Sequence, residues 1–321
     1  MDALSEINRL KAQMAGKIIG QEKIIHRLIV GLLANGNLLV EGLPGLAKTR
    51  AIKSMSSFIE SEFSRIQFTP DLLPSDVTGS ESMYENNGEY KFRFEKGPIF
   101  GNIILADEIN RAPAKVQSAM LEAMEERQVT IAGKTYKMPE LFMVMATQNP
   151  IEQEGTYPLP EAQMDRFLLH VNIEYLSAQD ELKMLQSLKS EAKEEPNAVD
   201  KIAQESIFQA RKEIEDVQIV KEIEEYIVDL VFASRYPQKY SEELAAYIDV
   251  GVSSRATIGL ELCSRVNAYL DGRNYVTADD VKAMVHDVFR HRLTLSYEAM
   301  AHAKSADAVI DMLVENVAVA L

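Results

Sequence analysis

Gly42-Leu-Pro-Gly-Leu-Ala-Lys48-Thr49 is the stretch that decides the fold, because it separates an apolar run from an amphipathic segment. Residues 38–40 are Leu-Leu-Val and predict a short buried strand, whereas the apolar residues that follow the loop recur at helical spacing. A glycine-rich loop between a strand and a helix offers backbone amides and the positive end of a helix dipole to a phosphate. Lys48 can reach the β and γ phosphates and the Thr49 hydroxyl can coordinate magnesium, so the stretch predicts a nucleotide site.

The rest of the first half alternates between strand and helix patterns. Residues 21–34 carry a helical apolar stripe, and so do the residues from Val116 to Met124. Three further apolar runs have the length of buried parallel strands, at 103–106, 141–146 and 168–173. This alternation predicts an α/β fold with a parallel sheet that helices cover.

Two polar segments interrupt that alternation, and we expect each to form a β-hairpin. Residues 80–96 fold back at Asn86-Asn87-Gly88, and residues 127–139 fold back at Ala132-Gly133-Lys134. No strand is predicted beyond Ser177. In this second half, the charged run at 189–200 is expected to be a loop and the other residues are expected to be helical. Helix starts are predicted at Ser253-Ser254 and at Thr277, which has Asp280 in the position of a capping box.

Composition narrows the class of protein. The chain has 321 residues, and its 34 basic and 49 acidic residues give a net charge of −15, which disfavours binding to nucleic acid. The single cysteine, Cys263, permits no internal disulfide and is expected to pack in the core, and the five histidines show no zinc-ligand spacing. No apolar run is long enough to span a bilayer, so we expect a cytoplasmic protein without membrane insertion.

Acidic and amide side chains follow two of the predicted strands. Asp107 and Glu108 end the run that begins at Ile103, and Asn149 follows the run at 141–146. Ligands of open α/β sheets bind at the carboxyl ends of the strands, so these groups are expected beside the phosphate loop. Asp107 would hold magnesium beside Thr49. Glu108, expected to point the other way from an extended strand, would orient and deprotonate a water molecule.

The order and the amino-acid sequences of these motifs resemble those of the AAA+ ATPases, and within that class those of the MoxR family. Five segments show the resemblance: residues 42–49, Ala106-Asp-Glu-Ile-Asn-Arg-Ala112, Ala146-Thr-Gln-Asn-Pro150, the segment from Gly155 to Phe167, and Val252-Ser-Ser-Arg-Ala256. The resemblance covers roughly residues 15 to 293. It implies an AAA+ core at 1–175 with the two hairpins as inserts, followed by a smaller all-α lid domain at 176–321.

The resemblance also implies roles for individual residues. ATP or ADP would be bound with Mg²⁺, Glu108 would be the catalytic glutamate, and Asn149 would be the first sensor. Gly20 matches the segment that contacts the adenine, and Thr49 and Asp107 would serve the metal. The residues expected to bind the nucleotide are Gly20, Gly42, Pro44, Gly45, Leu46, Ala47, Lys48, Thr49, Arg50 and Arg255.

Three arginines are implicated in hydrolysis by the same resemblance. Arg166 matches the arginine finger, which reaches the nucleotide of a neighbouring subunit in a ring, usually a hexamer. Arg111, beside Glu108, could share that role, and the sequence does not separate the two. An ion pair between Arg166 and Asp165 or Glu161 is the ordinary alternative. Arg255 matches the second sensor, which would connect nucleotide state to the angle of the lid.

The favoured function is ATP-driven remodelling or maturation of a protein client. Members of the family often work with proteins that carry a von Willebrand factor A domain, so such a partner is implied. The two alternatives are a nucleic-acid-stimulated AAA+ motor and a nucleotide-dependent switch or scaffold that turns over slowly. The net charge argues against the motor, and the intact set of Lys48, Asp107, Glu108 and Asn149 argues against the switch.

Overall fold

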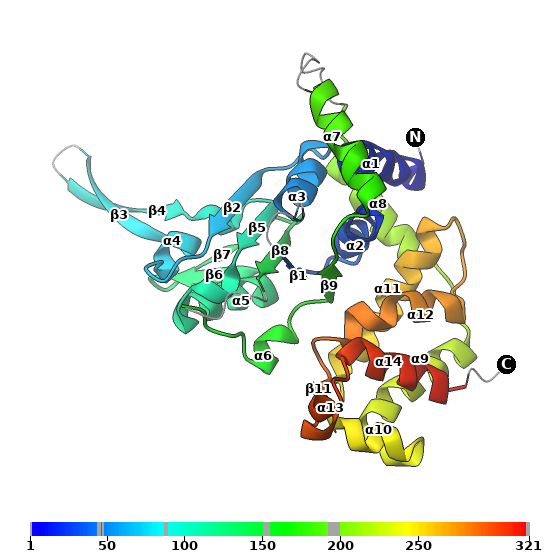
Figure 1. The fold of residues 1–321 in the computed structure, drawn as a ribbon. Coiled ribbons are helices and arrows are strands. Elements are labelled where there is room, and N and C mark those ends of the chain that lie inside the picture. The colour runs from blue at the N-terminus through cyan, green and yellow to red at the C-terminus, as the bar shows by residue number, and fades with distance from the viewer. Residues whose placement is uncertain are drawn as a thin grey trace.

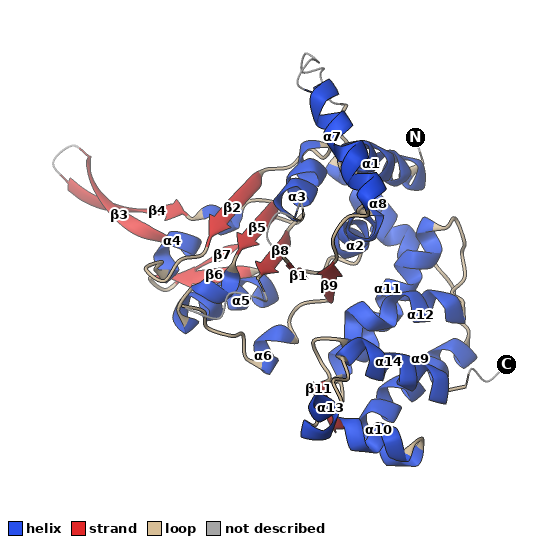
Figure 2. Cartoon of the chain, in the orientation of Figure 1, coloured by secondary structure: helices blue, strands red, loops and turns tan. Residues whose placement is uncertain are grey.

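A parallel sheet of five strands forms the centre of the first half, in the order β2-β5-β8-β1-β9 (Figures 1 and 2). The computed structural model describes residues 2–43, 46, 48–86, 89–149, 155–191 and 200–318. The strands are β1 (Leu38–Gly42), β2 (Phe63–Gln67), β5 (Ile103–Asp107), β8 (Met143–Gln148) and β9 (Leu169–Ile173).

The predicted strands are confirmed, but β2 was not predicted. Its sequence is Phe-Ser-Arg-Ile-Gln, and only Ile66 is buried. The strand lies at the edge of the sheet and pairs with β5 alone. An edge strand of this kind lacks the continuous apolar run that marks the central strands.

Helices cover both faces of the sheet. Alternate side chains of the strands point to opposite faces. Leu38 and Val40 pack in one core cluster with α1 (Ala3–Lys17), α2 (Glu22–Leu33) and α3 (Lys48–Ser57). Leu39 packs in the other cluster with α5 (Ala114–Glu126). The first cluster continues into the C-terminal helices, so the two halves of the chain share a core.

Both predicted hairpins are present. The first consists of β3 (Gly79–Asn86) and β4 (Glu89–Lys96), preceded by α4 (Pro74–Thr78), and it projects from the body of the molecule (Figure 1). The second consists of β6 (Gln128–Ile131) and β7 (Lys134–Lys137). The ring of Phe94 stacks on that of Tyr136 with the centroids 4.0 Å apart, so the base of the first hairpin rests on the second.

The second half is helical. After β9 the chain forms α7 (Ala178–Glu191) and then α8 (Gln204–Glu215), which returns to pack against α1 and α2. The remaining helices are α9 (Lys221–Arg235), α10 (Glu242–Tyr247), α11 (Ser254–Leu270), α12 (Ala278–Phe289), α13 (Tyr297–Ala301) and α14 (Ala306–Asn316). The division of the chain at residue 175 stays a prediction, and most of the charged run at 189–200 lies outside the described residues.

Both helix starts that were predicted in this half are present, but the half also contains two strands that were not predicted. Ser253 caps α11 by accepting a hydrogen bond from the amide of Arg255, and Thr277 forms a capping box with Asp280 at the start of α12. Two short strands, β10 (Ile248–Val250) and β11 (Thr294–Leu295), pair in antiparallel fashion. The expectation that no strand follows Ser177 was therefore wrong. With three and two residues, these strands are too short to show a pattern.

Cys263 is fully buried, as expected of a cysteine that packs in the core. Within the described ranges, no helix combines the length and the apolar character that crossing a bilayer requires.

Candidate active site

Lys48 joins the ends of two neighbouring strands. Its Nζ donates a hydrogen bond to the carbonyl oxygen of Gly42 at 2.6 Å and to that of Gln148 at 3.2 Å. Gly42 ends β1 and Gln148 ends β8, and these two strands are paired in the sheet. The lysine therefore stands at the edge where the strands end, at the start of α3.

Thr147 holds the two acidic residues that end the adjacent strand. Its buried hydroxyl donates to Asp107 Oδ1 at 2.7 Å and accepts from the amide of Glu108 at 2.9 Å. This side chain belongs to β8, whereas Asp107 ends β5. The lysine, both acids and the end of β8 thus meet at one edge of the sheet, which we call the rim.

Glu108 leaves the strand by a sharp turn. Its φ of 58° lies in the left-handed region, so Glu108 does not continue the extended strand, as was assumed when it was expected to point the other way from Asp107. The carboxylate accepts from Gln67 Nε2 at 2.9 Å and from Arg111 Nη1 at 3.0 Å, both at Oε2. Glu108 is therefore positioned by groups on both sides of it.

The unpredicted strand β2 supplies a second pair of polar groups to the rim. Arg65 donates to Asp107 Oδ2 from Nε at 3.1 Å and from Nη2 at 2.7 Å, and Nη2 also donates to Gln67 Oε1 at 2.6 Å. Arg65 and Gln67 are two residues apart, so both face the same side of the strand. They link the metal-binding candidate Asp107 to the base candidate Glu108.

The chemistry of the donors at the rim fits magnesium. A threonine hydroxyl and a carboxylate are hard oxygen ligands, and Mg²⁺ in proteins is held by one or two such groups together with water and phosphate oxygens. Asp107 is 9% exposed, and each of its two carboxylate oxygens accepts a hydrogen bond, so the group is fixed in direction. Thr49 and Asp107 are the residues that would hold the ion.

A cavity lies beside the rim, at the end of β9. It has a volume of about 230 Å³ and is lined by the residues from Gly20 to Ile24 and from Asn172 to Tyr175. Ile173 pairs with Gly42, which places the cavity next to the strand that leads into the phosphate loop. Gly20 has a φ of 71°, and a Cβ there would stand 2.7 Å from Cβ of Asp180. Gly20 therefore lies where a base could be held.

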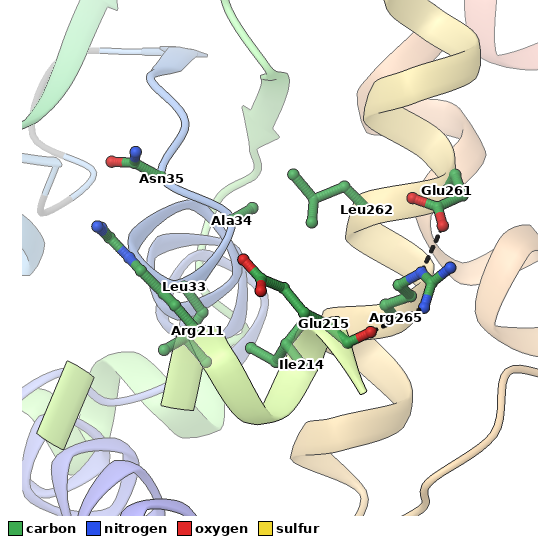
Figure 3. A pocket seen from close by; sticks show the side chains of 9 residues that line it. All are labelled: Leu33, Ala34, Asn35, Arg211, Ile214, Glu215, Glu261, Leu262 and Arg265. Atoms are coloured by element: carbon green, nitrogen blue, oxygen red, sulfur yellow. Dashed lines mark hydrogen bonds and ion pairs between the residues drawn. The ribbon is translucent and has the colours of Figure 1, made fainter. Parts of the chain in front are cut away.

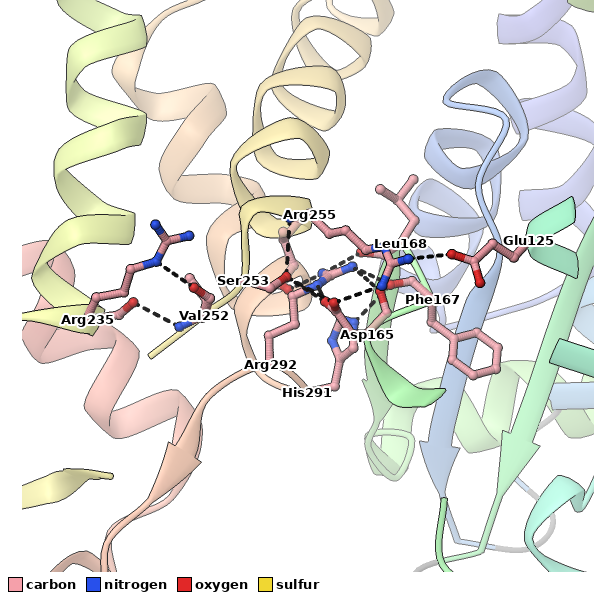
Figure 4. A network of polar contacts seen from close by, with 12 residues as sticks. Glu125, Asp165, Phe167, Leu168, Arg235, Val252, Ser253, Arg255, His291 and Arg292 are labelled. Carbon is pink, nitrogen blue, oxygen red and sulfur yellow. Dashed lines mark hydrogen bonds and ion pairs between the residues drawn. The ribbon is translucent and has the colours of Figure 1, made fainter. Parts of the chain in front are cut away.

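A second polar cluster contains Arg166 and Arg255, and Figure 4 shows Arg255 with its partners Glu125 and Asp165. Arg166 Nε pairs with Glu125 Oε2 at 2.8 Å, so its partner is neither Asp165 nor Glu161. Arg255 also pairs with Glu125, and its Nη1 lies 3.2 Å from Asp165 Oδ2. Both guanidinium groups therefore share the carboxylate of Glu125, at the end of α5. We call Arg166, Arg255 and Glu125 together the arginine cluster.

The arginine cluster lies at the edge where the strands begin. Arg127, two residues beyond Glu125, donates to the carbonyl oxygens of Phe142 and Asn35, which precede β8 and β1. The rim and the cluster are separated by strands of five or six residues, or about 16–20 Å at 3.3 Å per residue. Arg255 was expected to bind the nucleotide, but it lies far from the phosphate loop of its own chain. Arg111, by contrast, lies at the rim.

Comparison with known proteins places this arrangement in a family. Residues 37–169 match the ATPase family associated with various cellular activities (AAA), and residues 242–313 match the AAA lid domain. Chaperone MoxR1 of Mycobacterium tuberculosis is 41% identical over 98% of this chain and 81% of its own length. The chain belongs to the MoxR family of AAA+ ATPases. Protein YeaC of Bacillus subtilis, an uncharacterised protein, is 40% identical over 99% of this chain and 93% of its own.

A solved structure agrees with the fold of this MoxR-family chain. The crystal structure of a proposed ATPase from Cytophaga hutchinsonii superposes with a TM-score of 0.90 at 40% identity, and the match covers 99% of this chain and 96% of that one. An AAA+ core with a helical lid is thereby shown for this chain.

The remaining candidate residues of this MoxR-family chain stand as follows. Asn149 is buried directly after β8, Leu46 is buried in the loop, and Thr49 and Arg50 lie in the first turn of α3. Pro44, Gly45 and Ala47 lie outside the described residues. Sequence reasoning missed Thr147, Arg65, Gln67 and Glu125. Thr147 lies within the motif at residues 146–150, so that motif could have indicated it. Arg65 and Gln67 lie on a strand that was not predicted, and Glu125 belongs to no recognised motif.

Proposed function

We propose that this chain hydrolyses ATP with Mg²⁺ at sites shared between the subunits of a ring, and that it uses the cycle to remodel or mature a protein client. The observation that carries the proposal is the meeting of Lys48, Asp107 and Glu108 with the end of β8 at one rim of the sheet. The name of the relative from Mycobacterium tuberculosis, a chaperone, supports the class of client.

Each residue of the rim has a separate task in this proposal. Lys48 would exchange the carbonyl oxygens of Gly42 and Gln148 for β and γ phosphate oxygens, to which a charged donor binds more strongly. When bound, Mg²⁺ would neutralise charge on those phosphates, held by Thr49 and Asp107. Asn149 would hydrogen-bond the γ phosphate or the attacking water.

Glu108 would act as the general base. The hydrogen bonds from Gln67 and Arg111 both end on Oε2, so they would hold the carboxylate in place while Oε1 accepts a proton from water. Because Arg111 belongs to the same rim as Glu108, we assign it to the chain's own site.

The arginine cluster would complete the site of a neighbouring subunit. Arg166 and Arg255 lie at the opposite edge of the sheet from Lys48, so they can meet a triphosphate at a rim only if that rim belongs to another chain. A ring in which the rim of each subunit faces the arginine cluster of the next satisfies this condition. Heterologous contacts of this kind form a ring when the rotation from one subunit to the next closes. An arginine near the γ phosphate is worth about 10³–10⁵ in rate in related reactions.

The partners remain expectations drawn from the family. A protein with a von Willebrand factor A domain would recruit the client, and the cytoplasmic location stays a prediction. The first hairpin exposes Met83, Tyr90 and Phe92 on one face of its ribbon, where an apolar part of a client could bind.

Phosphate release by purified protein tests the proposal. Glu108→Gln should bind ATP normally and lose about 10²–10⁴ of the rate, since it removes the base without removing ligands of phosphate or metal. Glu122→Gln is the matched control, because Glu122 is exposed on α5 away from the rim and should keep the wild-type rate. Equal rates for wild type and Glu108→Gln would remove Glu108 from catalysis. A client should be retained by Glu108→Gln in ATP and released in ADP.

A further inference from the structure

The described part of helix α7 lacks a buried face. The helix is 14 residues long, and none of its described side chains, from Ala178 to Ser187, is buried. Leu182 is 57% exposed and Leu185 is 53% exposed, and Tyr175 just before the helix is 69% exposed. Figure 1 shows that the far end of α7 projects beyond α1 and α8. Isolated helices of this length are marginal in water, so α7 needs a surface that covers its leucines.

The position of α7 restricts what can cover it. Asp180, in its first turn, lies against Gly20, and Tyr175 lines the cavity beside the rim. A molecule that approaches the rim at the end of β9 therefore meets α7 at the same time. In the proposed ring, the molecule that approaches the rim is a second copy of this chain, which arrives with its arginine cluster.

The surface beside the arginine cluster is apolar. Arg255, Ile258 and Leu262 are spaced by three and four residues on α11, so they share one face of the helix. Ile258 is 68% exposed, and Leu262 is partly buried. From Arg255 to Leu262 the face runs about 10 Å along the axis, at 1.5 Å per residue.

This face ends in a pocket (Figure 3). The pocket has a volume of about 500 Å³ and lies between the end of α2, the end of α8 and the middle of α11. Its apolar walls are formed by Leu33, Ala34, Ile214 and Leu262.

The arginines at the borders of the pocket already have partners. Arg265 pairs with Glu261, and Arg211 donates to the carbonyl oxygen of Leu32 at 2.7 Å. The pocket therefore offers apolar walls to an incoming side chain, and neither arginine is left without an acceptor.

We propose that α7 docks on the α11 face of the neighbouring subunit, with Leu182 and Leu185 packed against that subunit's Ile258 and in its pocket beside Leu262. The inference rests on the proposed ring and deepens it, since it names the apolar contact that accompanies Arg255 to the neighbour's nucleotide. It gives the exposed leucines of α7 a surface to pack against. It also makes assembly depend on the segment that borders the base-binding cavity.

Disulfide trapping between two variants tests the contact. Chains carrying Leu185→Cys are mixed with chains carrying Ile258→Cys, both with Glu108→Gln, in the presence of ATP and Mg²⁺. A covalent dimer should form on oxidation, and it should require both variants. Cys263 should not react, because it is fully buried and burial raises the pKa of its thiol to about 12. The control replaces Ile258→Cys by Phe232→Cys, which is 44% exposed on α9, and it should give no dimer.

Charge on α7 gives a second test. Leu182→Lys with Leu185→Lys should keep the circular dichroism spectrum and nucleotide binding of the wild type, but elute as a monomer and lose about 10³ of the rate, as expected when the arginine in trans is lost. Val228→Lys with Phe232→Lys, which adds the same charge to α9, should assemble normally. If wild-type chains form no ring with ATP, the ring itself is wrong. If they form a ring that the α7 variant also forms, without the disulfide, the ring stands and this contact is wrong.

Discussion

Thr147 is the residue on which the geometry of the rim depends most. One hydroxyl group fixes the carboxylate that would hold magnesium and the amide of the residue that would act as base. It is almost fully buried, so water cannot replace it at low cost. Positioning groups of this kind commonly contribute 10–100-fold to activity or metal affinity.

Replacing that hydroxyl by a methyl group should slow hydrolysis without abolishing nucleotide binding. We expect Thr147→Val to lower the rate by about 10–100-fold and to raise the Mg²⁺ concentration needed for half-maximal rate, because Asp107 loses the donor at Oδ1. Thr147→Ser keeps the hydroxyl and should stay close to wild type. A Thr147→Val protein with an unchanged rate and an unchanged Mg²⁺ requirement would show that the hydroxyl does not position the site.

At the level of single residues, the sequence predicted which groups would gather but not how each is held. Lys48, Asp107 and Glu108 follow glycine-rich or apolar runs whose ends must coincide in a parallel sheet, so their meeting could be foreseen. The left-handed conformation of Glu108 could not, because nothing in a glutamate favours positive φ. Nor could Arg65 and Gln67, since their strand has only one buried residue.

At the scale of elements, the start of helix α12 shows how a capping box is extended by more distant contacts in the lid. Asp280 is 1% exposed and accepts hydrogen bonds from Arg273, Asn267, and the amide and hydroxyl of Thr277. Burial alone would raise the pKa of this carboxyl group, but those donors outweigh it and lower the pKa to about 2. The capping box was predicted from Thr277 and Asp280, whereas the contribution of Arg273 was not.

The depressed pKa of Asp280 predicts the sign of the pH dependence. Its contribution to stability is complete above about pH 4, the range of an unperturbed aspartate, and is lost as the pH falls toward 2. Asp280→Asn should lower the free energy of unfolding at pH 7 by about 2–3 kcal/mol and remove that part of the acid dependence. Urea titrations at pH 7 and pH 3 measure both, with Asp279→Asn, an exposed neighbour, as the control. A larger loss for Asp279→Asn would contradict the assignment.

The elements that the sequence predicted least well lack a hydrophobic pattern. The hairpins were found because turn residues separate two extended runs, and the central strands because they are apolar throughout. The short pair β10 and β11 and the edge strand β2 carry neither signal. Two of the side chains that position the candidate site lie on β2.

At the scale of the whole molecule, our proposal assigns a function to two opposite edges of one sheet. The rim carries the groups that would bind and activate the nucleotide, and the arginine cluster carries Arg166 and Arg255 at the other edge. Their pairing with Glu125 is partly exposed and contributes little to stability, so both arginines can leave it for a phosphate at small cost. In the proposed ring, each chain would therefore contribute two half-sites that cannot combine with one another.

Mixing two inactive variants tests this claim most directly. Arg166→Ala keeps an intact rim and Glu108→Gln keeps an intact arginine cluster, so neither should release phosphate alone. In an equal mixture with ATP and Mg²⁺, half of the rims and half of the arginine clusters are intact. About one contact in four therefore brings an intact rim against an intact arginine cluster, and the rate should recover to about a quarter of wild type. A mixture of Glu108→Gln and Asp107→Asn, both rim variants, should recover nothing. If the first mixture also stays inactive at every ratio while rings form, the site is not shared between subunits.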